Sequence, residues 1–480
     1  MKKRIVALFL MFMLLFSGIP ASFAASDGDA GDTFFTIQEN ANTQRKAIIQ
    51  TGQSVAAKAY MGQRLDSLLS AQEIQALASQ RYGKKDTLTV EEALQDVDTL
   101  FRTYKSAYGL YYYFGESAFS DAEATIIKEL NKKQSIHTND LEKLIGRNLL
   151  FMRDAHSRVG GYLPTVEGGY VKKYHYASNI YLQKDETGYF RIKSGEQWYL
   201  TAVNGNSQIA PYVKPCIQAD GSITYGLGQL FKDAAQAKSI KTITFSTANG
   251  KSKTEKIKWT LGENYAKSSI HTPDYSYSTK SGVPIVTIRS MKGDARQLND
   301  FVNSGKTLRG KKTVIIDIRS NGGGNNAYPD NWFKNFTGAL PQLRMTHIRN
   351  ESALAQALGN GSAKGWISNS KAGRFVPNKT NIIVLIDSNA GSAGESMIMN
   401  LRTLENVVFI GSNSAGFLIG ANQLDLSLPI SGMPVTITQG IHFIEGGENR
   451  DGIGFEPDIW VNPKDALTLA LKMVEYYNLA

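Results

Sequence analysis

From Val283 onward, short apolar runs alternate with polar, helix-forming segments, and this alternation constrains the fold more than any other feature of the chain. The runs have the length of strands and cover residues 283–289, 313–318, 382–386 and 407–410. A repeated strand, helix, strand pattern folds into an α/β layer on a largely parallel sheet. We therefore expect an α/β core over residues 281–480, with functional groups at the carboxyl ends of its strands.

Residues 34–156 are predicted to form a helical region. Two pairs have the capping-box pattern that marks a helix start, Thr89 with Glu92 and Ser120 with Glu123. In each pair a hydroxyl and a carboxylate would satisfy free backbone N–H groups at the first turn.

Residues 157–280 are predicted to form a β-rich insert, because tyrosine and β-branched residues dominate there and glycine and asparagine interrupt the runs. The segments 242–246 and 254–260 flank Asn249-Gly250, a pair typical of a hairpin turn.

The N-terminus has the layout of a secretory signal peptide. Three cationic residues precede an apolar run over residues 5–16, and small residues follow up to Ala24. The run is shorter than the about 20 residues of a membrane-spanning helix, although a retained anchor is the alternative. We expect a signal peptide over residues 1–24, a linker over 25–33, and a secreted or cell-envelope protein without stable membrane insertion.

The composition excludes several classes of function. The formal net charge is +10, but 53 Lys and Arg residues are scattered among 43 Asp and Glu residues, which disfavours nucleic-acid binding. The one cysteine, Cys216, excludes an intrachain disulfide and a cysteine-rich zinc site. The sequence has no P-loop and no complete dinucleotide-binding fingerprint. We therefore expect no cofactor and no metal.

The strand predicted at 313–318 runs into three consecutive glycines, Gly322, Gly323 and Gly324. Glycine allows positive φ and close approach to a backbone N–H. The loop is therefore either an oxyanion-binding loop or a tight turn between strand and helix.

The strand predicted at 382–386 leads to a small-residue turn and then a helix. The turn holds Ser392, which small residues flank, so its hydroxyl would be open to an incoming carbonyl. The N–H of Ala393 would point toward the oxyanion formed there. The alternative is that Ser392 is only an N-cap, the commonest role of a serine at this position.

Over roughly residues 140 to 465 the chain resembles the tail-specific, C-terminal processing serine proteases, including the tricorn core protease branch. The matching motifs are Asp317-Ile318-Arg319 leading to Asn321-Gly322-Gly323, Gly391-Ser392-Ala393-Gly394-Glu395, and Gly452-Ile453-Gly454-Phe455-Glu456-Pro457-Asp458-Ile459. The resemblance implies a core of the ClpP/crotonase type and a catalytic serine three residues before Glu395, which is Ser392.

One position departs from the family pattern. Most bacterial members carry a lysine base behind a glycine downstream of the serine, and here Phe417 follows Gly416 at that place. No lysine lies between Thr380 and Pro463. The base must therefore come from another part of the chain, because a serine hydroxyl needs a proton acceptor.

The tricorn branch takes its base from a histidine in the segment before the inserted β domain. Asp154-Ala155-His156-Ser157 matches that motif and follows a predicted helix whose apolar stripe reaches Met152. A histidine at a helix end or on the surface is the alternative interpretation. The histidines of the chain are His137, His156, His175, His271, His347 and His442.

In the same branch an acid six residues before the proline of the last motif orients the base. Counting back from Pro457 gives Asp451, and Glu448 is the nearby alternative. Such a carboxylate would hold the imidazole tautomer and stabilise the imidazolium. A solvated loop acid is the third interpretation.

The resemblance thus implies an exported endopeptidase that acts on protein or peptide substrates through an acyl-enzyme. The expected residues are Ser392 as nucleophile, His156 as base, Asp451 as orienting acid, and Ala393 with Gly322 or Gly323 as oxyanion donors. Two alternatives stay open: an inactive peptide- or ligand-binding protein on the same fold, and an esterase or amidase with the same acyl chemistry.

The insert has two interpretations. An ordinary β domain is the first, and a degenerate PDZ-like module is the second, because residues 200–205 resemble the strand and turn of PDZ domains. Such modules bind peptide C-termini by strand addition.

Overall fold

The computed structural model describes residues 33–51, 55–63, 65, 68–79, 83–161, 172–265, 273–444 and 450–480. The expected signal peptide, residues 25–32 of the expected linker, His271 and Glu448 lie outside the described residues. Among the helices of the described ranges, none combines the length and hydropathy that crossing a bilayer requires.

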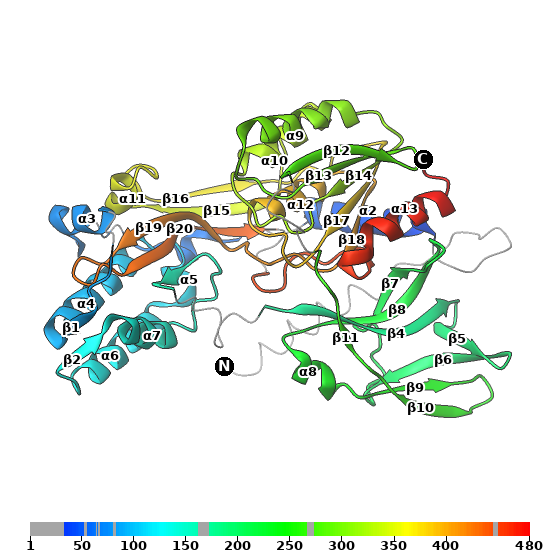
Figure 1. Ribbon diagram of the computed structural model, residues 1–480, viewed down its shortest axis with the longest axis horizontal. Coiled ribbons are helices and arrows are strands. Elements are labelled where there is room, and N and C mark those ends of the chain that lie inside the picture. The colour runs from blue at the N-terminus through cyan, green and yellow to red at the C-terminus, as the bar shows by residue number, and fades with distance from the viewer. Residues whose placement is uncertain are drawn as a thin grey trace. The chain divides into compact units, whose positions relative to one another are not determined.

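A six-stranded sheet of order β12-β13-β14-β17-β18-β21 forms the centre of the core (Figure 1). Its strands are β12 (Tyr275–Lys280), β13 (Val283–Ile288), β14 (Thr313–Asp317), β17 (Asn381–Ile386), β18 (Val407–Gly411) and β21 (Ile459–Trp460). All neighbours are parallel except the edge strand β12, which is antiparallel to β13. The α/β class and four of these strands are therefore as the sequence predicts. Strand β12 belongs to this sheet although its residues fall in the range expected for the insert.

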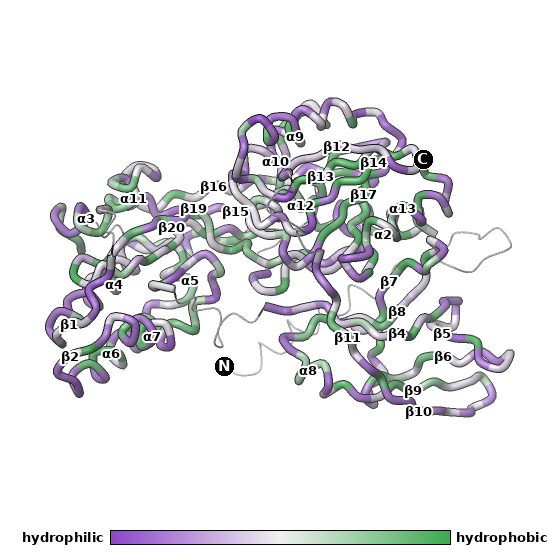
Figure 2. The backbone as a smooth tube through the Cα atoms, in the orientation of Figure 1, coloured by the Kyte–Doolittle hydropathy of each residue, from purple (hydrophilic) through white to green (hydrophobic). Residues whose placement is uncertain are grey.

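Helices cover both faces of the central sheet because its strands are apolar on both sides. On one face lie α9 (Ala295–Leu308), α10 (Ala327–Thr337) and α12 (Ala393–Leu401), and on the other lie α2 (Phe34–Thr51) and α13 (Ala466–Tyr476). Side chains alternate between the two cores, with Ile316 and Val384 on the first face and Ile315 and Ile383 on the second. In Figure 2 the central strands β13, β14 and β17 are coloured mainly as hydrophobic.

A second, antiparallel sheet of order β16-β15-β20-β19 lies against the helical region. Its strands are β15 (Met345–Glu351), β16 (Gly365–Lys371), β19 (Gly420–Ser427) and β20 (Pro434–Ile444), and β3 (Arg158–Val159) pairs with β20. The neighbouring elements are η2 (Ala57–Tyr60), α3 (Ala71–Ala78), β1 (Thr87–Thr89), α4 (Val90–Ala107), α5 (Tyr111–Phe114), α6 (Glu116–Leu130), β2 (Ser135–His137), α7 (Thr138–Asn148) and α11 (Ala353–Ala357). Sheet and helices share one apolar core.

The helix starts differ in part from the sequence prediction. Thr89 caps α4, and its capping box with Glu92 is confirmed. The prediction for Ser120 was wrong, because Ser120 lies inside α6 and donates to the carbonyls of Glu116 and Ser117. A hydroxyl bonded to the preceding turn is compatible with a helix interior.

The insert forms an antiparallel sheet of order β10-β9-β6-β5-β4-β8-β7, with β11 paired to β4. Its elements are β4 (Tyr174–Lys184), β5 (Tyr189–Lys193), β6 (Glu196–Val203), β7 (Val213–Ile217), β8 (Ile223–Phe231), α8 (Ala234–Ser239), β9 (Thr242–Ser246), β10 (Ser252–Lys256) and β11 (Thr260–Leu261). The hairpin predicted around Asn249-Gly250 is confirmed, with Gly250 at φ +79°. Its second strand covers Ser252–Lys256 instead of the predicted residues 254–260.

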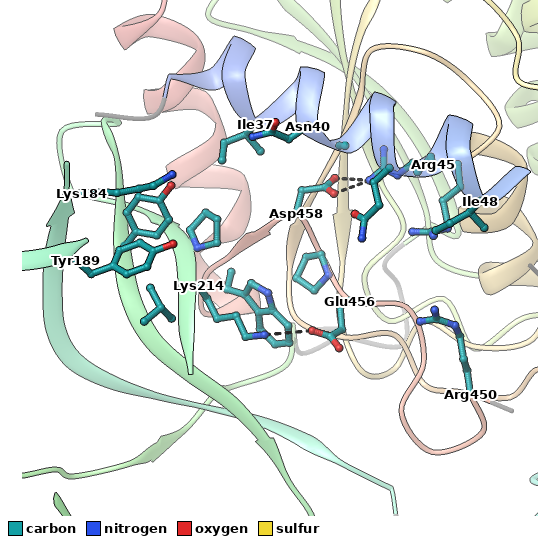
Figure 3. Close-up of a pocket in the computed structure, with 18 residues that line it drawn as sticks. Ile37, Asn40, Arg45, Ile48, Lys184, Tyr189, Lys214, Arg450, Glu456 and Asp458 are labelled. Carbon is teal, nitrogen blue, oxygen red and sulfur yellow. Dashed lines mark hydrogen bonds and ion pairs between the residues drawn. The ribbon is translucent and has the colours of Figure 1, made fainter. Parts of the chain in front are cut away.

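Arg45 fixes α2 to the core beside a pocket of about 570 Å³ (Figure 3). Its guanidinium donates to both carboxylate oxygens of Asp458, at 2.6 and 2.5 Å, and to the carbonyl of Val407 at 2.6 Å. Across the pocket, Lys214 of β7 lies 3.5 Å from Glu456. Glu456 and Asp458 of the last family motif therefore make ion pairs that join elements of the fold, and η4 (Pro463–Asp465) follows them toward α13.

Candidate active site

Three loops at the carboxyl ends of β14, β17 and β18 meet at one edge of the central sheet. They cover residues 318–326, 387–392 and 412–419. The amide of Gly391 donates to the carbonyl of Asn321 at 2.9 Å, and the amide of Ala415 donates to the carbonyl of Ala390 at 2.8 Å. These backbone bonds hold the serine turn between the other two loops, at the edge where parallel sheets place their functional groups.

Ser392 lies at the junction between this turn and α12. It is half-buried and has φ +51° and ψ −119°, an uncommon conformation for a residue with a side chain. Ala393 is the first residue of α12, so its N–H has no acceptor within the helix. A strained serine at a helix start, next to an unused helical amide, is the arrangement of a nucleophile elbow.

Close backbone contacts explain the small residues of the turn. A Cβ at Gly394 would lie 2.5 Å from the carbonyl oxygen of Asn321. A Cβ at Gly391 would lie 3.0 Å from Ala415 and 3.1 Å from the ring of Phe417. Glycine at both positions lets the turn press against the two neighbouring loops.

The two glycines predicted as oxyanion donors differ in their hydrogen bonding. The amide of Gly323 donates to Asn321 Oδ1 at 3.0 Å. The amide of Gly322 makes no hydrogen bond to any of the described residues, and Gly322 is exposed. The Gly322 amide is thus available to a ligand, whereas Ala393 is buried and its amide makes no hydrogen bond to the described residues.

Glu395 is a fully buried carboxylate that joins the serine turn to the loop after β18. It accepts from the hydroxyl of Ser414 and from the amides of Gly416, Phe417 and Ser392, at 2.6 to 3.2 Å. Burial raises the pKa of Glu395, and these donors oppose the rise. The carboxylate therefore positions the backbone of Ser392.

Asp317, at the end of β14, is held between two arginines. Arg289 and Arg319 each donate to both of its carboxylate oxygens at 2.6 to 2.8 Å. Burial raises the pKa of Asp317, but hydrogen bonds from Arg319 and Arg289 outweigh it and lower the value to about 2. Both guanidinium groups lie 4.4 Å from the ring centre of Tyr265. This buried group anchors the start of the glycine loop.

His156 lies in a turn after α7, which ends at Asn148, earlier than its apolar stripe predicts. The side chain is 14% exposed, and its ring packs edge-on against Phe417, with centroids 6.0 Å apart. Burial lowers the pKa of His156, while the charge of Asp154 raises it and that of Arg158 lowers it. At neutral pH the imidazole is therefore uncharged, as a general base requires.

The carboxylate 3.8 Å from His156 Nδ1 belongs to Asp154. Its Oδ1 also accepts from the amide of His156 at 2.9 Å, and its Oδ2 accepts from the hydroxyls of Tyr108, Ser157 and Thr438. Sequence reasoning included Asp154 in the motif around His156 without giving it a role. The signal that could have found it was its position two residues before the histidine.

Asp451 lies near these groups and is fully buried. Its Oδ1 accepts from the amides of Leu418 and Ile419, both at 2.8 Å. Burial raises the pKa of Asp451 well above its usual range, and the charge of Asp154 raises it further. The two carboxylates are thus close enough to influence each other.

Ser392 and His156 line the same pocket, which has a volume of about 460 Å³. Phe417 lines it between the serine turn and the histidine, and Gly324 and Leu418 contribute to its walls. Of the predicted residues, the structure therefore brings the serine and the histidine to one cavity, with the glycine loop beside them.

Comparison with known proteins gives three results. Residues 282–461 match peptidase family S41. The nisin-resistance protein of Lactococcus lactis subsp. lactis is 29% identical over 151 residues, which cover 29% of this chain and 44% of that protein. The chain thus matches less than half the length of this curated relative.

Solved structures with a similar chain path include mature CPAF in complex with lactacystin, with 13% identity, a TM-score of 0.43, and coverage of 81% of this chain and 99% of that one. The photosystem II D1 C-terminal processing protease gives 14% identity, a TM-score of 0.38, and coverage of 79% and 96%.

Proposed function

Because residues 282–461 form a peptidase family S41 domain, we propose that this protein is a serine endopeptidase with Ser392 as its nucleophile. The observation that carries the proposal is the strained Ser392 at the start of α12, open to a pocket that His156 also lines. No lysine of the described residues lines this pocket, and Phe417, at the position that the resemblance gives to lysine, lines it instead.

The reaction begins when His156 accepts the proton of the Ser392 hydroxyl as its oxygen attacks a peptide carbonyl. The tetrahedral intermediate collapses to an acyl-enzyme, and protonated His156 gives the proton to the leaving amine. Water then attacks the ester with His156 as base, which releases the carboxylate product and restores Ser392.

The oxyanion of the tetrahedral intermediate is bound by backbone amides. Ala393 supplies one donor, as the first amide of α12. The glycine loop supplies the second. The Gly322 amide is available for this, whereas the Gly323 amide would first have to release Asn321 Oδ1.

Asp451 is proposed as the acid that orients His156, and Asp154 is the competing candidate because of its 3.8 Å distance from His156 Nδ1. The pair can be separated by mutation. If Asp451 orients the ring, Asp451→Asn lowers kcat far more than Asp154→Asn does. For each variant, kcat is calculated from the concentration of folded protein.

Three further features belong to the proposal. The central sheet with its covering helices is a ClpP/crotonase-like core, and the insert is a β-rich domain for which an ordinary β fold and a degenerate PDZ-like module stay the two alternatives. The protein is exported by a signal peptide over residues 1–24 and acts in the cell envelope or outside the cell. Its substrates are proteins or peptides.

Ser392→Ala tests the proposal, with hydrolysis of an unfolded protein by the purified mature chain as the readout. We expect complete loss of hydrolysis with an unchanged circular dichroism spectrum, because Ser392 contributes a hydroxyl and little packing. His156→Gln is expected to reduce kcat by a similar factor. Hydrolysis that persists in Ser392→Ala would mean that another residue is the nucleophile. A wild type that hydrolyses nothing would favour the binding-protein interpretation, and a preference for simple esters would favour an esterase.

A further inference from the structure

One face of α12 extends from the nucleophile to the far end of the active-site pocket. Ser392, Ser396 and Asn400 are spaced four residues apart and all line this pocket. Eight residues of helix separate the Cα atoms of Ser392 and Asn400 by about 12 Å. The helix therefore connects the reacting serine to a second group of polar side chains.

This second group contains an acidic side chain. Asp330 of α10 is half-buried, and its Oδ1 accepts from Asn400 Nδ2 at 2.9 Å. It is the one Asp, Glu, Lys or Arg among the described residues that line the pocket. No basic side chain of the described residues forms an ion pair with it.

Asn400 is completely buried, and its Oδ1 has no hydrogen-bond partner among the described residues. A buried acceptor without a donor is costly. The hydrogen bond from its Nδ2 to Asp330 fixes the orientation of the amide group, and with it the position of the unpartnered Oδ1. Asn326 Oδ1 lies on the same wall and accepts from Ser396 Oγ at 3.0 Å. The wall thus offers acceptors and a negative charge.

Other titratable groups of the pocket leave this negative charge in place. Burial lowers the pKa of the three histidines that line the pocket. The value falls to about 4 for His347 and to about 3 for His442, and the pKa of His156 moves in the same direction. All three are therefore neutral at neutral pH. Burial raises the pKa of Asp330, and the hydrogen bond from Asn400 and the charge of Lys371 oppose the rise. Lys371 is exposed on β16. Its ammonium can remain in water.

We propose that Asp330 and Asn400 form a subsite for a cationic side chain, lysine or arginine, of a residue adjacent to the cleaved bond. This inference rests on the proposed peptidase function and specifies its substrate class. An ammonium or guanidinium group would donate to Asp330 and to Asn400 Oδ1 at once, which satisfies the orphaned acceptor and compensates the half-buried charge.

The separation along α12 requires a long side chain. A lysine ammonium reaches about 6 Å from its Cα. Helical side chains lean toward the N-terminus of their helix, so the amide of Asn400 lies closer to Ser392 than its Cα does. Among side chains beside the scissile carbonyl, long ones therefore approach this group and short ones do not.

Cleavage-site mapping tests the subsite. An unfolded protein is first digested with the wild type, which identifies the position beside the cleaved bond where a particular residue type is preferred. Hydrolysis is then compared for peptides that carry lysine, norleucine or glutamate at this position. We expect lysine or arginine beside the cleaved bonds, and Asp330→Asn should lower kcat/KM for the lysine peptide about 10- to 100-fold while changing that for the norleucine peptide by less than about 3-fold. Asp300→Asn, an exposed acid of α9, is the matched control and should leave the preference unchanged.

A binding measurement separates the failure of the subsite from the failure of the peptidase. Fluorescence anisotropy of the same labelled peptides with Ser392→Ala should show tighter binding of the lysine peptide, and Asp330→Asn in that background should remove the difference. Equal affinities for lysine and norleucine peptides, or an unchanged lysine preference in Asp330→Asn, would overturn the subsite. Lysine-selective binding by a wild type that hydrolyses nothing would keep the subsite and reject the peptidase.

Discussion

Gly323 lies so close to Ser392 that a residue with a side chain does not fit at position 323. A Cβ at Gly323 would lie 2.7 Å from the Cβ of Ser392 and 3.0 Å from the amide nitrogen of Ala393, and the residue has φ +108°. The glycine loop therefore forms one wall around the nucleophile and the first amide of α12. From the sequence, the glycine loop was either an oxyanion-binding loop or a tight turn. This contact makes the loop part of the candidate site.

Gly323→Ala is expected to lower kcat by about 100-fold or more, because the methyl group must displace either Ser392 or the Ala393 amide. Gly322→Ala is the matched control. It keeps the backbone N–H, and a Cβ at Gly322 meets nothing within 4 Å. Steady-state kinetics of both variants check this, and equal loss in the two would mean that the contact with Ser392 is unimportant.

The pH dependence of kcat/KM follows from the environment of His156. The base must be neutral, and burial lowers its pKa, so protonation that stops the reaction occurs at a lower pH than for a free imidazole. We expect the acidic limb to lie below pH of about 6.5.

Arg158 provides a test of this assignment, because its charge lowers the pKa of His156 and its side chain is exposed. Arg158→Gln should move the acidic limb to higher pH at low ionic strength, whereas Arg296→Gln on α9 should not. A limb that stays fixed in Arg158→Gln would argue that another group is the base.

The ion pair of Arg45 with Asp458 is expected to be important for stability. Arg45 is 3% exposed, so Arg45→Ala leaves a largely buried carboxylate without this partner and should cost about 3 to 5 kcal/mol of unfolding free energy. Lys251→Ala removes the exposed pair with Glu196 at 3.1 Å and should cost at most about 1 kcal/mol. Denaturant unfolding measures both values, and a similar small loss in the two would contradict the structural role of Arg45.

The sequence predicted the α/β core well, because buried parallel strands are continuous apolar runs that periodicity detects. It did not predict that β12 joins the central sheet, since the alternating polar residues of that edge strand resemble those of the insert. Ser120 was misassigned because a local capping motif cannot show that the helix has already begun at Glu116.

For the site, sequence order and motifs indicated the serine, the histidine and the glycine loop, which lie at one edge of the sheet. Contacts between distant segments could not be predicted in this way. The role of Glu395 depends on four donors from two loops. The proximity of Asp330 to Asn400 depends on the packing of α10 against α12, which no local pattern encodes.

The most direct test of the central claim is to identify the residue that a fluorophosphonate modifies in the mature wild-type protein. The reagent phosphonylates an activated serine oxygen with loss of fluoride, and peptide mass spectrometry locates the adduct. We predict one adduct at Ser392 that is absent in Ser392→Ala and strongly reduced in His156→Gln. Modification of a different serine, or equal labelling in His156→Gln, would contradict the assignment.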